Sequence, residues 1–490
     1  MGFSLLVVCL GVFDRPCGTE SLPYRAKSGH LFSYEVSLVQ NRSVECGDTT
    51  CSVHCSGDLP PWTGVGTTLD LSLGTCAAGT IMTSGTALSP TSLYGYIQMT
   101  AAARVIRYTG PPPWTNVGNF PYTSSTDHRY VSSASLTIAG GTAHLVVGMY
   151  GASDMRDASV NGAVTGNAVY SGIGLALDAT LATWTFLDYP IGSSYLVTMS
   201  PDDEWVLMGS TYLQFATRSH VSVFRRHAGA LVLAEVLAPP YPTSAYFGYG
   251  MAVAGTTLVV GDSSDTSCGP GYPQPGDPTC PSQGVVHVYA LSEGHWQRGE
   301  AVRAPVTKPL SFGNAVDLWA GGDGMVVGAN GDGSRSVVIN QGMGLSDGTS
   351  VGSAFVYRRK GGRYVFETYL KGSQTADGHY FGLAVSAWAT STVELIGVSA
   401  RADSYASPTG VAATGWRVTG TPSGSVALGG AAYLFGRAVS GGAAAGNWTE
   451  MAVIRPPRAA ATYFGTSLSL RHGLMIIGSA TACTLYVIKL

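Results

Sequence analysis

The residues whose spacing most resembles a catalytic motif are Gly348, Ser350 and Gly352, which fit the pattern Gly-x-Ser-x-Gly. In hydrolases this pattern places a nucleophilic serine on a sharp turn between a strand and a helix. Here it leads into the strand-like segment 354–358, and none of the 10 histidines stands at a spacing that pairs with the serine. Because short motifs of this kind are common in Gly- and Ser-rich chains, we predict a chance match and a protein that is not an enzyme.

Metal-ligating residue types gather in two segments. The first has three cysteines with a histidine and a further cysteine nearby: Cys46, Cys51, Cys55, His54 and Cys76. Their spacing is not that of a zinc finger, so disulfides are preferred to zinc. The second segment, 330–334, alternates oxygen-bearing side chains with glycine, but a turn that bonds to its own side chains explains this pattern. We expect no metal and no other cofactor, with calcium as the alternative.

The cysteine usage suits an oxidising compartment. Of the nine cysteines, Cys9 lies in an apolar N-terminal run, which leaves an even number for pairing. Cys268 and Cys280 bracket a loop rich in Pro and Gly, so we predict a disulfide between them. No connectivity can be assigned to the others: Cys17, Cys46, Cys51, Cys55, Cys76 and Cys483. Asn41 and Asn447 are glycosylation acceptors if the chain is secreted.

Charge and hydropathy exclude several partners. Charged residues make up 12% of the 490 residues and the formal net charge is -3, so nothing in the chain favours binding to nucleic acid. Residues 1–12 are apolar but too short to span a bilayer, and segment 1–29 is interpreted as a weak secretion signal or an ordinary strand. With no longer apolar run, we predict a secreted or cell-surface protein without a direct membrane span.

A repeat beginning with Phe-Gly organises the second half of the chain. It recurs at four places: Phe247-Gly248, Phe312-Gly313, Phe381-Gly382 and Phe464-Gly465. Each copy is followed by hydrophobic alternation and a strand ending in glycine, at residues 261, 328, 397 and 478. Four short strands separated by Gly-containing turns predict an antiparallel meander, which is one blade of a β-propeller.

Counting such units predicts an all-β, seven-bladed propeller over residues 30–490. The expected blades are 65–114, 130–190, 194–240, 246–305, 311–372, 380–457 and 463–490. The last has room for three strands, so residues 30–40 are expected to complete it and close the ring, with 41–64 as a Cys-rich insertion.

The Phe-Gly units resemble FG-GAP repeats, the blades of integrin α-subunit head domains. The resemblance covers roughly residues 65–490 and is most specific from 246 onward. It implies a binding or adhesion protein with calcium sites in the first turn of each blade. That turn lacks carboxylates at 254–256 and 471–473, and Asp317 with Asp323 supplies half a site at most, so the calcium site is not carried over.

The longest connections are expected on one face of the propeller, at 151–167, 262–283, 329–351 and 399–428. Long loops on a rigid scaffold usually carry recognition, although they can also be solvated decoration. The candidate binding residues on these loops are Asp154, Asp262, Asp265, Asn330, Asp332 and Asp403.

Three functions are compatible with these patterns. The preferred one is a non-catalytic module that binds a protein or glycan. The low charge content also suits a structural subunit of an extracellular or virion-type assembly. A hydrolase or lyase with an unrecognised site in the propeller cavity is the third.

Overall fold

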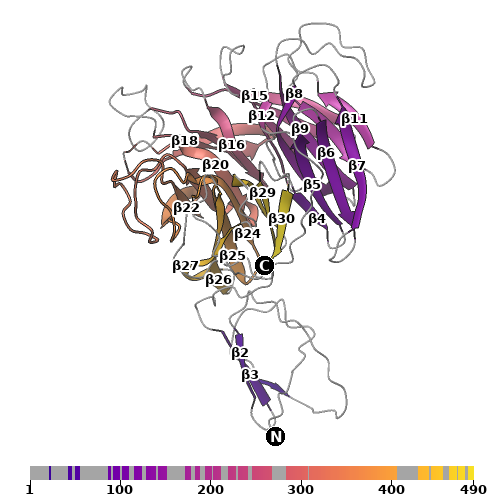
Figure 1. Cartoon of the computed structure of the whole chain (residues 1–490). Helices are drawn as coiled ribbons and strands as arrows, with labels where there is room; N and C mark the ends of the chain where they lie inside the picture. The colour runs from indigo at the N-terminus through magenta and orange to yellow at the C-terminus, as the bar shows by residue number, and fades with distance from the viewer. Residues whose placement is uncertain are drawn as a thin grey trace.

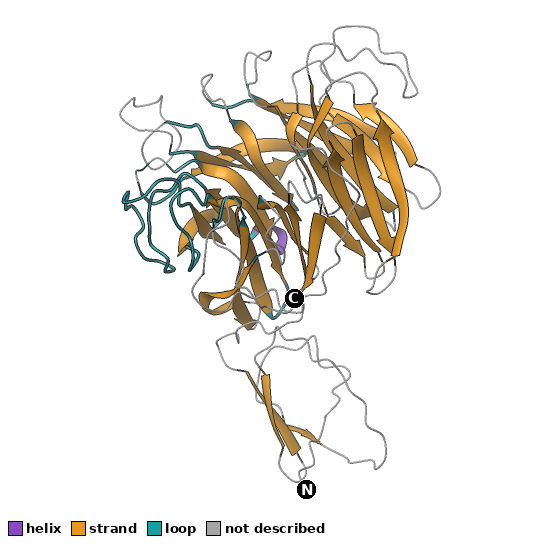
Figure 2. Cartoon of the chain, viewed as in Figure 1, coloured by secondary structure: helices purple, strands orange, loops and turns teal. Residues whose placement is uncertain are grey.

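The computed structural model of the chain consists almost entirely of β-strands (Figures 1 and 2). Before residue 194 it describes 21–23, 42–46, 50–55, 86–89, 92–99, 102–109, 115–123, 129–139, 142–151, 172–177 and 182–187. It describes residues 194–490 except for 201, 203, 211–218, 228–229, 241–245, 267–282, 307, 309, 405–428, 441–442, 456–462, 472 and 480–483. In this described part no helix is long and apolar enough to cross a membrane.

Six four-stranded sheets and one three-stranded sheet follow one another along the described chain from residue 86. The first three contain β4 (Thr86–Ser89), β5 (Ser92–Met99), β6 (Ala102–Thr109), β7 (Thr115–Thr123); β8 (Arg129–Ala139), β9 (Thr142–Gly151), β10 (Gly172–Leu177), β11 (Ala182–Leu187); and β12 (Ser194–Met199), β13 (Trp205–Ser210), β14 (His220–His227), β15 (Ala230–Leu237). The next two contain β16 (Phe247–Ala254), β17 (Thr257–Asp262), β18 (Val285–Ser292), β19 (His295–Val302); and β20 (Phe312–Trp319), β21 (Gly324–Ala329), β22 (Ser353–Lys360), β23 (Arg363–Leu370). The last two contain β24 (Phe381–Ala389), β25 (Val393–Ala400), β26 (Ala431–Ser440), β27 (Ala443–Ile454); and β28 (Phe464–Arg471), β29 (Leu474–Ser479), β30 (Thr484–Lys489).

Each sheet is an antiparallel meander whose strands pair in chain order. The first strand of each sheet contacts the first strand of the next, in the order β4, β8, β12, β16, β20, β24 and β28, and β28 also contacts β4. The first strands therefore lie innermost and the fourth strands outermost. The chain is all-β, with sheets in a propeller-type arrangement (Figure 1).

The N-terminal part departs from the sequence-based boundaries. The first sheet spans 86–123 instead of the predicted 65–114, because the three prolines at 111–113 separate β6 from β7 and not one unit from the next. A separate sheet contains β1 (Ser21–Pro23), β2 (Arg42–Cys46) and β3 (Thr50–Cys55), and its hairpin lies apart from the other sheets in Figure 1. Residues 30–40, predicted to complete the last sheet, lie outside the described residues.

Close backbone approach between neighbouring sheets explains the glycine of the Phe-Gly repeat. Gly313 and Gly382 have φ angles of 90° and 88°, which disfavour a side chain. A Cβ on Gly261 would lie 2.0 Å from the carbonyl oxygen of Gly313, and one on Gly328 would lie 2.1 Å from that of Gly382. Glycine is therefore needed on both sides of these two contacts.

At the fourth copy of this contact, the structure differs from the repeat pattern in the sequence. The glycine predicted to end the second strand at 397 does not lie at the contact. Ser399 takes that place, and a Cβ on Gly465 would lie 3.1 Å from the Ser399 Cβ. Gly397 packs against the side chain of Leu468 instead. The misalignment arose because Val-Ser-Ala extends β25 beyond Gly397 to Ala400.

The phenylalanine of each repeat joins two sheets. Phe312, Phe381 and Phe464 are fully buried. Their backbone N–H groups donate to the carbonyl oxygens of Gln283, Val351 and Gly429 in the preceding sheet, at 2.9, 3.0 and 3.1 Å. Each therefore adds a parallel bridge to the glycine that opens the third strand of that preceding sheet, namely Gly284, Gly352 or Gly430.

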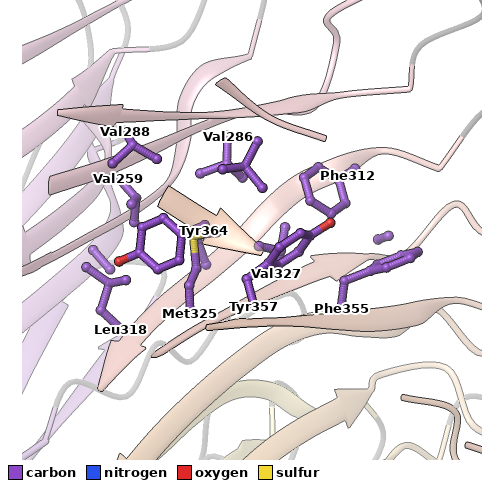
Figure 3. Close-up of a cluster of buried hydrophobic side chains, with 14 of the residues drawn as sticks. Val259, Val286, Val288, Phe312, Leu318, Met325, Val327, Phe355, Tyr357 and Tyr364 are labelled. Carbon is purple, nitrogen blue, oxygen red and sulfur yellow. The ribbon is translucent and has the colours of Figure 1, made fainter. Parts of the chain in front are cut away.

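The rings of these phenylalanines fill the core between sheets. Figure 3 shows Phe312 at one end of a cluster of side chains from two sheets, which includes Val286 and Val288 of β18 and Met325 and Val327 of β21. Burial of side chains of this size stabilises the fold by roughly 1.5–3 kcal/mol each.

A ring from the third strand of the same sheet contacts each Phe ring. The pairs are Phe247 with His287, Phe312 with Phe355, Phe381 with Tyr433 and Phe464 with Tyr486, with centroids 5.6, 5.5, 5.1 and 5.1 Å apart.

The outermost strands are tied by a repeated glutamate. The backbone N–H of Trp296 in β19 donates to Glu235 of β15 at 2.8 Å, and that of Tyr364 in β23 donates to Glu300 of β19 at 2.7 Å. Both glutamates are the sixth residue of their strand and both donors the second. Neighbouring sheets are thus joined at their inner strands by the glycine contacts and at their outer strands by the glutamate bonds.

Candidate functional site

The aspartates predicted to bind a ligand are buried in the protein. Asp262, Asp265, Asp332 and Asp403 have exposed fractions between 0% and 4%. Asp154 lies outside the described residues. The four described candidates therefore offer no accessible carboxylate, because each side chain is buried among groups of its own sheet or loop.

Two of these aspartates form buried ion pairs. Asp265 binds Arg303 at 3.1 Å and Asp403 binds Arg455 at 2.7 Å. Each aspartate stands three residues after the end of the second strand, and each arginine directly follows the fourth strand. The pair thus connects two strands that are not neighbours in the sheet.

Asp332 occupies the same position in the sheet between them. Its carboxylate accepts hydrogen bonds from the Tyr369 hydroxyl and from the backbone N–H of Ser334 at 3.0 Å. Lys371, which follows the fourth strand, is fully buried and donates to the carbonyl oxygens of Ser334 and Gly352. Burial lowers the pKa of Lys371 to about 8, although the nearby charge of Asp332 opposes this shift.

The 330–334 turn is therefore closed by its own groups. The bond from Ser334 N–H to the Asp332 carboxylate matches the self-bonded turn that competed with calcium in the sequence interpretation. Asn330 is half-buried, and its N–H donates to the Asn314 side chain at 3.2 Å. Within the described ranges, no group of three or more His, Cys, Asp or Glu side chains could hold a metal ion.

The half calcium site considered at Asp317 also has other partners. The Asp317 carboxylate accepts from the backbone N–H of Ala387 at 2.8 Å and from the Ser386 hydroxyl at 3.1 Å. Arg471, from the next sheet again, lies 3.2 Å away. The carboxylate therefore links three consecutive sheets.

The basic residues that follow the fourth strands were not singled out in the sequence. Arg303, Lys371 and Arg455 each come directly after an apolar strand end, in Ala-Val-Arg, Tyr-Leu-Lys and Val-Ile-Arg. An alignment of the repeats with one another would have shown this recurring basic residue. It would have indicated a structural partner for the buried aspartates.

The Gly-x-Ser-x-Gly motif has no nucleophile geometry. It is followed by strand β22 and not by a helix, as its sequence context predicted. Ser350 has a φ of 47°, and its carbonyl oxygen accepts from the backbone N–H of Tyr380 at 3.0 Å. Among the described residues, no histidine hydrogen bonds to the Ser350 hydroxyl.

A second serine does contact a histidine. The Nε2 atom of His379 lies 3.3 Å from the Ser404 hydroxyl, and its Nδ1 atom lies 3.8 Å from the Asp403 carboxylate. The backbone N–H groups of Ala376 and Ser404 donate to Nδ1 at 3.2 Å and to Nε2 at 3.4 Å. Burial lowers the pKa of His379, with Asp403 opposing. Both ring nitrogens therefore face backbone N–H groups, and the ring lies among the buried contacts around Asp403.

A charged cluster lies between the sheets that begin with β20 and β24. Glu394 is buried and accepts from Trp319 at 3.0 Å, from Arg358 at 2.6 Å and from Arg437 at 2.7 Å. Burial opposes ionisation of Glu394, but the hydrogen bonds from Arg358 and Trp319 hold its pKa below the ordinary value. Arg437 also binds Glu367 and lies 4.6 Å from the Trp448 ring centroid. The carboxylates and guanidinium groups of this cluster bind one another and so tie the two sheets together.

The accessible candidate is the face that carries the long loops. Its described loop, residues 330–352, connects β21 to β22 and projects from the sheets as the teal trace in Figure 2. Val337, Val338 and Leu345 on this loop are 41%, 46% and 50% exposed. The loop contacts the start of β24, because the N–H groups of Gly378 and Tyr380 donate to the carbonyls of Thr349 and Ser350.

The predicted modification sites are placed only in part. Asn447 is exposed on the outer strand β27, where a glycan would meet solvent. Asn41, Cys268 and Cys280 lie outside the described residues, so glycosylation at Asn41 and the disulfide stay predictions.

Comparison with known proteins gives a likeness of shape. The sequence matches no protein-family model and no curated protein. Among solved structures, hydrazine synthase of Kuenenia stuttgartiensis is 10% identical, with 86% of this chain and 99% of that chain covered and a TM-score of 0.48. A lectin of Aleuria aurantia in complex with Fucalpha1-6GlcNAc is 10% identical, covers 77% and 96% of the two chains and has a TM-score of 0.40. The N-terminal domain of Nup159 is 6% identical, covers 88% and 97% and has a TM-score of 0.43. Likeness at this level indicates neither a ligand nor a reaction.

Proposed function

We propose that the chain is a closed, seven-bladed propeller of FG-GAP type that acts at the cell surface or outside the cell as a non-catalytic interaction module. Closure is supported by the contact of β28 with β4, which joins the last sheet to the first. The FG-GAP assignment is supported by the repeated Phe-Gly contact between successive sheets. Residues 30–40 remain the proposed fourth strand of the last blade.

The observation that carries the function is the ordered loop 330–352. Its backbone is held from below, because Lys371 donates to the Ser334 carbonyl and the Asn340 N–H donates to the Tyr369 carbonyl at 2.9 Å. Its tip nevertheless exposes apolar side chains at Val338 and Leu345. An anchored loop with exposed apolar side chains loses little entropy on binding, which favours recognition.

The absence of catalysis is proposed because several buried acids form ion pairs instead of a site open to a substrate. Asp265, Asp403 and Glu394 each bind arginine. A cavity hydrolase would need a convergent acid and base with access to a substrate.

A capture experiment with loop variants tests the interaction function. The immobilised full chain is incubated with an extracellular extract of its native source, and retained material is compared before and after protease or periodate treatment. We expect Val338→Ser with Leu345→Ser to reduce retention several-fold, since these side chains are about half exposed. Val365→Ser, at a 43% exposed site on outer strand β23, is the matched control and should retain normally. Equal retention by both variants would reject this face.

A second candidate function, a subunit of an extracellular assembly, is favoured by outer strand β15. Its alternate residues Val232, Ala234 and Val236 are all exposed, the two valines by 52% and 40%. The corresponding strand β19 instead exposes His295, Gln297 and Arg298. An apolar edge strand invites pairing with another chain.

The assembly function is tested by mass measurement over a concentration series. Higher-order species that disappear in Val232→Lys, but persist in the control Gln297→Lys, would support it. A monomer at every concentration would reject it.

A further inference from the structure

Tyrosines recur at the start of the first strands. The residue before the Phe of each repeat is Tyr246, Ser311, Tyr380 or Tyr463. Tyr380 and Tyr463 adopt positive φ angles of 55° and 58°, and the Tyr380 side chain is 38% exposed. Since the N–H of Tyr380 binds the carbonyl of Ser350, this ring borders the long-loop face.

Arg401 lies between these two tyrosines. It follows β25 directly, and the N–H of the next residue, Ala402, donates to the carbonyl of His379 at 3.3 Å, which places the arginine beside Tyr380 in the backbone. Its guanidinium carbon lies 5.3 Å from the centroid of the Tyr463 ring. Tyr380, Arg401 and Tyr463 therefore form a strip across two consecutive sheets.

The guanidinium of Arg401 has no anionic partner in the described part of the chain. Its Nε atom is buried and finds no hydrogen-bond acceptor there. Five other arginines that are at least partly buried pair with carboxylates: Arg303, Arg358, Arg437, Arg455 and Arg471. Arg359, also half-buried, donates to the Thr257 hydroxyl at 2.7 Å instead. A buried polar atom without an acceptor costs free energy, and a bound acceptor would recover it.

We infer that the Tyr380–Arg401–Tyr463 strip binds the carboxylate of an acidic sugar, of the uronic or sialic acid type. Guanidinium pairs with a carboxylate through two parallel hydrogen bonds. Tyr380, whose backbone neighbours that of Arg401, would add a flat apolar surface with a polar edge.

A single-carboxylate sugar fits the charges better than an acidic peptide. Arg401 is one cation without a carboxylate, whereas its closest basic neighbours in the repeat, Lys371 and Arg455, are buried beside Asp332 and Asp403. A peptide with several carboxylates would call for several accessible bases.

The inference rests on the proposed interaction function and is tested by calorimetric titration of the full chain. The probes are the methyl glycoside of a sialic acid, its methyl ester, a neutral hexose glycoside and a tetraglutamate peptide. We expect saturable binding of the free acid and at least tenfold weaker binding of the ester, since the charge-assisted pair is lost. Arg401→Gln should weaken binding of the acid by about tenfold or more.

Two further variants keep the test decisive. Arg363→Gln, at an exposed arginine on β23, is the matched control and should bind normally. If Arg401→Gln does not fold, Tyr380→Ala takes its place as the test variant and should weaken binding about threefold or more. Equal binding of acid and ester, unchanged binding by Arg401→Gln, or tighter binding of tetraglutamate than of the sugar would overturn the inference. If the loop variants still lose their captured partner, the interaction function stands and only this ligand class falls.

Discussion

The sheet formed by β12–β15 differs from the three that follow it in one buried contact. In the following sheets an aspartate three residues after the second strand lies near a base that directly follows the fourth strand: Asp265 with Arg303, Asp332 with Lys371 and Asp403 with Arg455. In the β12–β15 sheet the corresponding sequence positions are Leu213 and Ala238. Both kinds of sheet nevertheless share the inner glycine contact and the outer glutamate bond.

The difference separates what the repeat needs from what it adds. The glycine contacts join consecutive sheets in both regions, and the glutamate bonds join β15 to β19 and β19 to β23, so both kinds of contact occur with or without the aspartate–base pair. The aspartate–base contact lies within one sheet and can be dispensed with. It fastens the base of the long loop, which in the β20–β23 sheet is the described loop 330–352.

The largest expected effect comes from breaking one such pair. Asp403→Ala leaves Arg455 buried without its carboxylate and should lower the free energy of unfolding by about 3–5 kcal/mol. Denaturant unfolding measures it. The double variant Asp403→Ala with Arg455→Leu should lose less than the single one, and Ala238→Ser, at an exposed site, should be nearly silent. If the double variant were less stable than Asp403→Ala alone, the fold could not dispense with the pair.

Replacing a glycine at the inner contact should lower the stability of the fold equally in both regions. Gly382→Val and Gly248→Val each force a β-branched side chain onto a φ of 88° and into the neighbouring sheet, at about 2–4 kcal/mol. Melting temperatures compare them with Gly299→Val, a site on β19 whose nearest atom would be 3.5 Å from the new Cβ. A large loss at Gly382 with none at Gly248 would show that the contact is not common to the repeat.

A smaller effect is expected where a histidine replaces the usual aromatic ring. His287 is fully buried, neither ring nitrogen has a partner within the described residues, and burial lowers its pKa to about 3, with Arg298 and Arg303 contributing. His287→Phe should stabilise the fold by about 1–2 kcal/mol at pH 7, because Phe355 occupies the same place in the next sheet.

The same residue predicts an acid dependence. In the unfolded chain His287 takes up a proton near pH 6.5, but in the folded chain only near pH 3. The stability of the fold is therefore not reduced by this residue above pH 6.5. Below that it should fall by about 1.4 kcal/mol per pH unit from this residue. Unfolding curves at pH 7, 6 and 5 should show a shallower decline for His287→Phe. An unchanged slope would assign the acid sensitivity elsewhere.

The smallest effect concerns the outer glutamates. Glu235→Ala and Glu300→Ala each remove one bond to a backbone N–H, and both should cost about 1 kcal/mol or less. Thermal unfolding of the two variants measures this directly. Unequal losses would mean that the outer tie differs between the regions.

The sequence predicted the features that the backbone itself imposes. Gly313 and Gly382 are needed because two backbones meet, and such a requirement leaves a glycine in every copy of the repeat. The four-stranded meanders followed from hydrophobic alternation between Gly-containing turns. The first unit was misplaced, since the prolines at 111–113 indicate a connection without saying which one.

The candidate site was less accessible to sequence reasoning. An aspartate in a Gly-rich turn has the same local pattern whether it faces solvent or an arginine, and Arg303 and Arg455 lie 38 and 52 residues from their partners. Arg401 and Tyr463 likewise belong to different sheets. Their proximity depends on how consecutive units stack, which no local pattern encodes.

The bond from each repeat's Phe to the preceding sheet has a consequence for how the chain can be divided. The Phe381 N–H completes the sheet that ends at Leu370, and the Phe381 ring packs between that sheet and its own. If the chain were divided between the two sheets, the earlier sheet would lose the hydrogen bond and the ring that Phe381 provides. The later sheet would keep that ring, but with one side exposed. A piece that runs from the second strand of one sheet to the first strand of the next would keep this Phe with the sheet that it completes.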